Sequence, residues 1–354
     1  MSGLRDIIVK RVAAEGPMPL SEYMGLCLSH PEYGYYTTRD PLGTAGDFIT
    51  APETSQMFGE LIGLTLAQAW MEQGTPERFT LAELGPGRGT LMADILRATR
   101  AVSGFHAAMS VHLVETSPAL RAVQAETLGR EGVAWHKSVE ALPDAPLYLV
   151  ANEFFDALPI RQVERAEGEL WRERCVGMQD GRLTLGLSDA TPLPALQHRL
   201  EDTRPGDVVE FSSPAQAIAA TIGAKIKLRG GTALIVDYGD WRSLGDTFQA
   251  LQAHEPVDPF DTPGTADLTA HVDFEALARA APTAHSRLTP QGVLLERLGI
   301  TQRAQALAKR LSGDTLSQHI AAHRRLTHPQ EMGTLFKAMA LYPEGAALPP
   351  GFEA

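Results

Sequence analysis

Three glycines at alternate positions, Gly85, Gly87 and Gly89, follow a short apolar run that ends in the acid Glu83. Helical apolar spacing begins directly after them. A strand, a tight glycine turn and a helix in this order bring the backbone close to a ligand at a helix N-terminus. Glycine is needed there because a Cβ would collide with the ligand and because some turn positions require positive φ. The stretch therefore predicts a site for a nucleotide-type cofactor.

The spacing of the glycines separates the cofactor classes. The dinucleotide fingerprint is G-x-G-x-x-G, and here the third glycine comes one residue early, with Thr90 at the place of the expected glycine. A phosphate-binding P-loop requires a lysine beside its Ser or Thr, and none stands beside Thr90. The pattern E-x-G-x-G-x-G from Glu83 is typical of S-adenosylmethionine (SAM) methyltransferases. In these enzymes the turn holds the amino-acid part of a cofactor without phosphate, so Glu83 and the three glycines are candidate cofactor residues.

A second acid supports a cofactor with a ribose. The apolar run Val111 to Glu115 ends in a carboxylate 26 residues after Gly89. An acid at the end of the second strand is placed to accept hydrogen bonds from both ribose hydroxyls. Alternatively, Glu115 is a solvated strand-end carboxylate or a partner for the helix that opens at Ser117-Pro118.

A further group of polar residues, Asn152, Glu153 and Asp156, follows the strand that ends at Ala151. The carboxyl ends of the strands in a doubly wound sheet line the ligand crevice, so these side chains should lie beside the glycine turn. A carboxylate there could orient a substrate or accept a proton. With an arginine substrate, carboxylates would grip the guanidinium group and leave one nitrogen facing the methyl group. The alternative is that Asp156 only caps a turn.

Two other polar residues are ambiguous. Asp237 ends another strand and either reaches the rim of the crevice or stabilises a turn before Gly239. His271 is a single histidine before a helix, which more often caps or packs than catalyses. The histidines have no pair at metal-ligand spacing, so we predict no metal site.

Composition limits the remaining classes. The chain has 354 residues and a net charge of −12, which argues against nucleic acid and is compatible with a cationic substrate. We find no apolar run long enough for membrane insertion. The two cysteines, Cys27 and Cys175, should be reduced thiols, so we expect a cytoplasmic protein.

The order of the elements predicts an α/β fold: a Rossmann-like doubly wound sheet with an N-terminal helical cap, an antiparallel β insertion and a helical C-terminal region. The expected division is a cap at 1–75, a core at 76–160 and 205–240, an insertion at 161–204, and an insertion plus mainly helical region at 241–354.

Several segments together resemble one known family, the MidA-like methyltransferases, whose mitochondrial members assist assembly of respiratory complex I. They are P-E-Y-G-Y-Y (31–36), G-D-F-I-T-A-P-E (46–53), E-L-G-P-G-R-G-T-L (83–91), L-V-E-T-S-P (113–118), A-N-E-F-F-D-A-L-P (151–159), D-Y-G (237–239), D-L-T-A-H-V-D-F (267–274) and M-G-T-L-F-K (332–337).

The resemblance implies a SAM-dependent protein arginine methyltransferase that makes symmetric dimethylarginine on a protein partner, such as a complex I subunit. It also implies that the segment with Asp47 and Phe48 closes over the cofactor, and that Asn152, Glu153 and Asp156 face the substrate. The alternatives are a methyltransferase for a small molecule or another side chain, and an assembly chaperone that binds SAM with little catalysis. The chain shows no obvious mitochondrial transit peptide, so we expect a bacterial cytoplasmic member, or a mature organellar form; its oligomeric state stays open.

Overall fold

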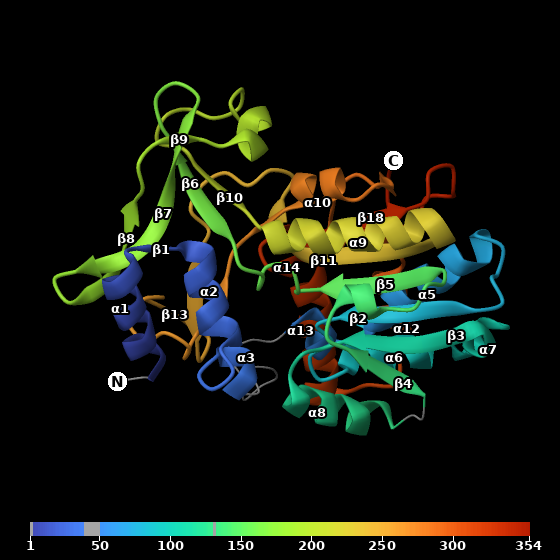
Figure 1. The fold of residues 1–354 in the computed structure, drawn as a ribbon. Coiled ribbons are helices and arrows are strands. Elements are labelled where there is room, and N and C mark those ends of the chain that lie inside the picture. The colour runs from blue at the N-terminus through green and yellow to red at the C-terminus, as the bar shows by residue number, and fades with distance from the viewer. Residues whose placement is uncertain (1–2, 39–49, 130–131) are drawn as a thin grey trace.

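A nine-stranded sheet forms the centre of the larger lobe (Figure 1). The computed structural model describes residues 3–38, 50–129 and 132–354. Five neighbouring strands of this sheet are parallel, in the order β11-β5-β2-β3-β4. Their bounds are β2 Phe79–Leu84, β3 Met109–Val114, β4 Val133–His136, β5 Leu147–Asn152 and β11 Gly231–Asp240.

Helices cover both faces of this sheet, as the alternation of elements predicts. All six residues of β2 and all six of β5 are buried, which is typical of strands enclosed on both sides. One face packs against α5 (Gln56–Glu72) and α6 (Thr90–Ala98). The other packs against α9 (Ser213–Arg229) and α10 (Phe274–Ala280). The sheet therefore divides the larger lobe into two apolar cores.

The strand order reverses between β2 and β5. From β2 the chain proceeds outward through β3 and β4, with α8 (Pro118–Leu128) between them, and then returns to β5 and β11 on the other side. Such a switch point opens a crevice at the carboxyl ends of the two central strands. The glycine turn after β2 and the acids after β5 are thus brought to one place.

The smaller lobe contains a second, antiparallel sheet (Figure 1). Its order is β1-β7-β6-β10, and helices α1 (Gly3–Glu15) and α2 (Leu20–Ser29) pack on it with a core of their own. A three-stranded sheet, β13-β12-β14, joins that core. The bounds are β1 Met18–Pro19, β6 Arg161–Arg165, β7 Leu170–Gln179, β8 Arg182–Leu187, β9 Thr191–Pro192, β10 Val208–Phe211, β12 Gln249–Gln252, β13 Glu255–Val257 and β14 Asp267–Thr269.

Two strands differ from the expected arrangement. We expected Val208–Phe211 in the alternating core, but β10 pairs antiparallel with β6 in the smaller lobe. The C-terminal region is mainly helical, as expected, but it also contains the strand β18 (Phe336–Tyr342), which was not expected and pairs antiparallel with β11 in the central sheet. Both segments are short apolar runs, and such a run does not itself specify which edge it will join. The division of the chain into domains otherwise stays a prediction.

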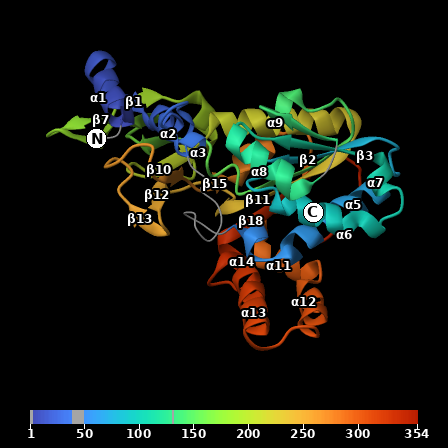
Figure 2. The same ribbon diagram turned by 90° about the horizontal axis from the view of Figure 1, so that it is seen from below.

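The rest of the C-terminal region is helical and also adds short strands to the central sheet. Figure 2 shows α12 and α13 projecting side by side from the larger lobe. The elements are α11 Gln291–Arg297, α12 Ile300–Ala308, α13 Gly313–Thr327, α14 Met332–Leu335, β15 Val272–Asp273, β16 Ala284–His285 and β17 Thr289–Pro290. Within the described part of the chain, no helix combines the length and the apolar character needed to cross a membrane. Cys27 and Cys175 are both free.

Candidate active site

A cavity of about 1240 Å³ lies where the carboxyl ends of the core strands meet the smaller lobe. Three groups of elements line it: the turns after β2, β3 and β5, the segment around β11, and segments of the smaller lobe and the C-terminal helices. The lining includes Tyr36, Gly85, Gly87, Glu115, Glu153, Phe154, Asp156, Tyr238, Asp267 and His271.

The glycine turn has the backbone that its sequence predicts. Gly85, Gly87 and Gly89 have φ of 57°, 53° and 83°, in the left-handed region that favours glycine. The Gly85 amide donates to the Val114 carbonyl at 3.0 Å, which ties the turn to β3. A Cβ on Gly85 would lie 2.8 Å from the Phe154 ring. The turn therefore forms a cradle that a side chain would fill.

Glu83 lies beneath this turn and is only 3% exposed. Its burial raises the pKa of the carboxyl to about 8, although the Met92 amide donates to it. Among the described residues, Oε2 of Glu83 has no hydrogen-bond partner. A buried carboxylate oxygen without a donor suits a cationic group such as the ammonium of an amino-acid cofactor. Neither Glu83 nor Gly89 belongs to the lining of the cavity itself.

Glu115 both faces the cavity, as a ribose acid would, and accepts a hydrogen bond at the start of a helix, as the alternative interpretation expects. It lines the cavity, and its Oε1 also accepts from the Ser117 amide at 2.8 Å, at the entry to α8. The Gln124 amide donates to Oε2 of Glu115 at 3.3 Å and to the Gly87 carbonyl at 2.8 Å. Burial raises the pKa of Glu115. The predicted ribose acid is thus connected to the glycine turn through one side chain, Gln124.

Asp237 holds the turn that follows β5. Its Oδ2 accepts from the amides of Phe154, Phe155 and Asp156 at 3.1, 2.9 and 3.3 Å, and its Oδ1 accepts from the Tyr238 amide at 3.0 Å. Burial and the nearby acids raise the pKa of Asp237, while these amide donors oppose the rise. The structure therefore favours a turn-stabilising role for Asp237. The turn that it stabilises follows β5, the neighbour of its own strand β11.

Glu153 connects the end of β5 to the N-terminal region. It has a positive φ of 51°, and its Oε1 accepts from the Ala51 amide at 3.0 Å and from Nδ2 of Asn152 at 3.1 Å. Ala51 begins α4 (Ala51–Thr54). Burial raises the pKa of Glu153 to about 7. Asn152 is buried and does not line the cavity. Its side-chain amide bonds to Glu153, which does line it.

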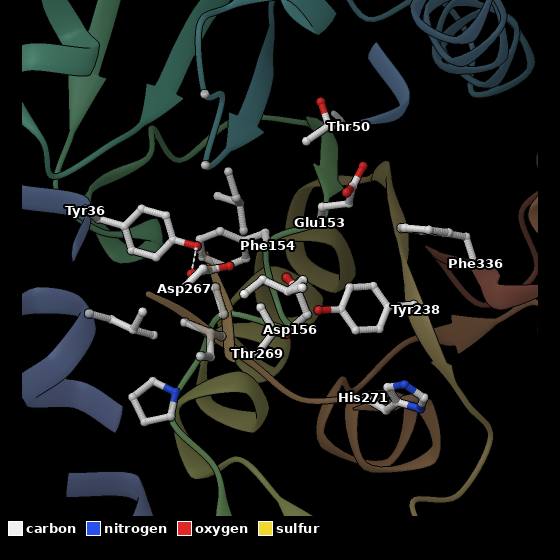
Figure 3. A pocket seen from close by; sticks show the side chains of 18 of the residues that line it. Tyr36, Thr50, Glu153, Phe154, Asp156, Tyr238, Asp267, Thr269, His271 and Phe336 are labelled. Carbon is white, nitrogen blue, oxygen red and sulfur yellow. Dashed lines mark hydrogen bonds between the residues drawn. The ribbon is translucent and has the colours of Figure 1, made fainter. Parts of the chain in front are cut away.

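Asp156 faces the middle of the cavity, opposite the Tyr238 hydroxyl (Figure 3). Its side chain is buried, and Oδ1 has no hydrogen-bond partner within the described ranges. Burial raises the pKa of Asp156 to about 6, and the Tyr238 hydroxyl acts in the opposite direction. His271 lines the same wall, edge-on to the Tyr238 ring at 5.4 Å between centroids. Asp156 is therefore placed to meet a ligand in the cavity, and its predicted role at the substrate stays a prediction.

Sequence reasoning missed two residues of this site, Tyr36 and Asp267. Both lie in segments that carry the family resemblance, so the sequence marked these segments without indicating what the two residues do. Asp47 and Phe48, expected to close over the cofactor, lie outside the described residues. No group of three or more His, Cys, Asp or Glu side chains suited to a metal ion occurs in residues 3–38, 50–129 and 132–354.

The fold and the site define a class I SAM-dependent methyltransferase. The model of a family of S-adenosyl-L-methionine-dependent methyltransferases matches residues 61–294. The structure superposes with a TM-score of 0.82 on a crystal structure from Burkholderia thailandensis bound to S-adenosyl-homocysteine (SAH), at 29% identity, covering 98% of this chain and 93% of that one. The predicted fold class and cofactor are therefore confirmed, and SAM is the cofactor of this protein.

The chain belongs to the MidA-like family of these methyltransferases, as its motifs predict. "Protein arginine methyltransferase NDUFAF7, mitochondrial" of Homo sapiens is 37% identical, over 96% of this chain and 83% of the human protein. The corresponding Drosophila melanogaster homologue is 35% identical, over 94% of this chain and 83% of its own length.

Proposed function

We propose that this enzyme is a protein arginine N-methyltransferase. The observation that carries the proposal is Asp156, a buried carboxylate with one oxygen free of partners among the described residues, in the cavity beside the glycine turn. A cationic substrate would offset the cost of burying this charge. The names of the human and Drosophila relatives, both called arginine methyltransferases, support the same acceptor.

The residues of the chain would divide the work as follows. Gly85, Gly87 and Gly89 would hold the methionine part of SAM, with Glu83 and Glu115 at its ammonium and its ribose. When bound, SAM supplies an electrophilic methyl group on its sulfonium sulfur. Positioning is then the main task, because the acceptor nitrogen must point its lone pair in line with the methyl carbon.

Asp156 and Glu153 would orient the acceptor. Asp156 would accept hydrogen bonds from the guanidinium group, while Glu153 adds negative charge and, with Asn152, fixes the adjoining wall. A nitrogen–carbon bond forms as the carbon–sulfur bond breaks, and the nitrogen loses a proton that a carboxylate can accept. The raised pKa of Asp156, about 6, leaves this carboxyl mostly ionised at neutral pH.

The family resemblance extends the proposal to a protein substrate, such as a complex I subunit, and to symmetric dimethylarginine as the product. A bacterial cytoplasm is the proposed location. The test is an assay with the purified protein, radiolabelled SAM and lysate from a strain that lacks the gene. We expect label in one protein and, after hydrolysis, in dimethylarginine. Label in a small molecule or in another side chain would overturn the proposal.

A further inference from the structure

A further carboxylate, Asp267, lies in the cavity wall contributed by the smaller lobe. It is 2% exposed, and it begins β14, which pairs with β12 rather than with the central sheet. The Tyr36 hydroxyl donates to its Oδ1 at 2.8 Å. Tyr36 belongs to α3 (Tyr35–Thr38) in the N-terminal region. The 231 positions between the two residues in sequence explain why the pair was not visible as a motif.

Asp267 and Asp156 approach the same space from different lobes. Figure 3 shows Tyr36 and Asp267 on one side, Tyr238 on the other, and Asp156 between them. Burial raises the pKa of the Tyr36 hydroxyl, and the negative charges of Asp267 and Asp156 raise it further, which agrees with this arrangement. Asp156 and Asp267, two of the carboxylates that line the cavity, therefore each face the hydroxyl of a different tyrosine.

This arrangement discriminates between cations. A guanidinium group is planar and carries five N–H donors in a fixed fork, so it can bond to two separate carboxylates at once. An ammonium group is a compact point charge that one carboxylate and water can satisfy. Two acids on different walls, with fixed orientations, thus favour a guanidinium over an ammonium.

We propose that Asp267, oriented by Tyr36, joins Asp156 and Glu153 as a carboxylate of the acceptor site and sets the preference of the enzyme for arginine over lysine. This inference rests on the proposed function and assigns to it two residues from outside the methyltransferase core. Asp267 contacts the guanidinium group, whereas Tyr36 acts through Asp267 and is a positioning residue. The smaller lobe is then part of substrate recognition.

The test measures side-chain recognition without turnover. The probes are the N-acetyl methylamides of arginine and lysine, titrated by NMR into the whole protein saturated with SAH. We expect the wild-type protein to bind the arginine probe at least about tenfold more tightly, because one additional charge-assisted hydrogen bond contributes that much. Asp267→Asn should abolish the preference, and Tyr36→Phe should reduce it by about threefold, since it leaves the carboxylate in place.

The matched control is Asp261→Asn, six positions earlier on the exposed surface. It removes the same charge outside the cavity and should leave the preference unchanged. SAH affinity, measured by calorimetry, should stay the same in all three variants, which also shows that each is folded. Equal binding of the two probes to the wild-type protein, binding of neither, or an unchanged preference in Asp267→Asn would overturn the inference.

Failure of this inference and failure of the proposed function are distinguishable. If the wild-type enzyme methylates arginine but Asp267→Asn keeps the same KM and kcat for that substrate, only the role of Asp267 is wrong. If the label from SAM enters another residue type, the proposed function itself is wrong.

Discussion

Gly85→Ala should damage both the stability and the cofactor site of this enzyme, for two separable reasons. At the φ of 57° observed for Gly85, a residue with a Cβ is strained by about 1–2 kcal/mol. The added Cβ would also lie 2.8 Å from Cδ2 of Phe154, so the ring must move. Such overpacking costs about 1–3 kcal/mol more. We therefore expect a loss of about 2–5 kcal/mol in the free energy of unfolding.

Gly168→Ala separates the two effects. Gly168 has a similar φ of 69°, but a Cβ there meets no atom within 4 Å. This control should lose only the backbone contribution, about 1–2 kcal/mol. Urea unfolding of both variants measures the difference, which we expect to be about 1–3 kcal/mol.

Calorimetry with SAH gives a second, independent measure. Because the cradle at Gly85 would be filled and Phe154 displaced toward the cavity, the dissociation constant for SAH should rise at least about tenfold. Gly168→Ala should leave it unchanged. If the two variants lose equal stability and bind SAH equally well, then neither the steric contact nor the proximity of the turn to the cofactor has been interpreted correctly.

Three further outcomes follow from the buried acids. The Glu83 carboxyl has a pKa of about 8 in the folded protein and about 4.5 in the unfolded chain, so the wild type loses stability as pH rises between these two values. Glu83→Gln removes this carboxyl and with it the pH-dependent loss. The unfolding free energy of this variant relative to wild type should therefore be larger at pH 8 than at pH 5 by on the order of 3 kcal/mol, and a difference independent of pH would contradict it. Glu153→Gln keeps an acceptor for the Ala51 amide and for Asn152, so it should retain stability but lower kcat/KM by about tenfold. Glu153→Ala removes the acceptor and should also lose about 1–3 kcal/mol in the free energy of unfolding, measured in urea. A wild-type kcat/KM in Glu153→Gln would exclude a role for the charge. The kcat/KM of the wild type should rise as pH increases through about 6 and again through about 7, where Asp156 and Glu153 ionise. Asp156→Asn should remove the lower of the two rises; a rise through pH 6 that persists in the variant would assign it to another group.

The elements whose signals are local were predicted closely. β2 ends at Leu84, next to the predicted strand-end acid Glu83, and β5 ends at Asn152, next to the predicted strand end at Ala151, because an apolar run and the polar residues that end it are adjacent in sequence. The antiparallel strands of the insertion at 161–204 were also expected, and Asp180 and Gly181 supply the positive φ values of the turn between β7 and β8. Local chemistry was sufficient in each case.

Placement of the remaining strands depended on distant partners. β10 and β18 are short apolar segments of ordinary composition, and their sheets were decided by which edges were open. The same limit applies to Asp237, whose carboxylate serves amides 81 to 83 positions earlier in the chain. No pattern near Asp237 could have revealed that role.

By itself, the sequence determined the cofactor class and brought the predicted cofactor residues together. Glu83, the three glycines and Glu115 lie in one β-α-β segment, where strand direction and turn geometry follow from short-range spacing. Only the tertiary structure decided the rest of the site. It brought Tyr36 and Asp267 opposite Asp156 and directed Glu153 toward Ala51, because contacts between lobes depend on how two separate apolar cores pack. The spacing of residues along the chain does not determine how the two lobes pack.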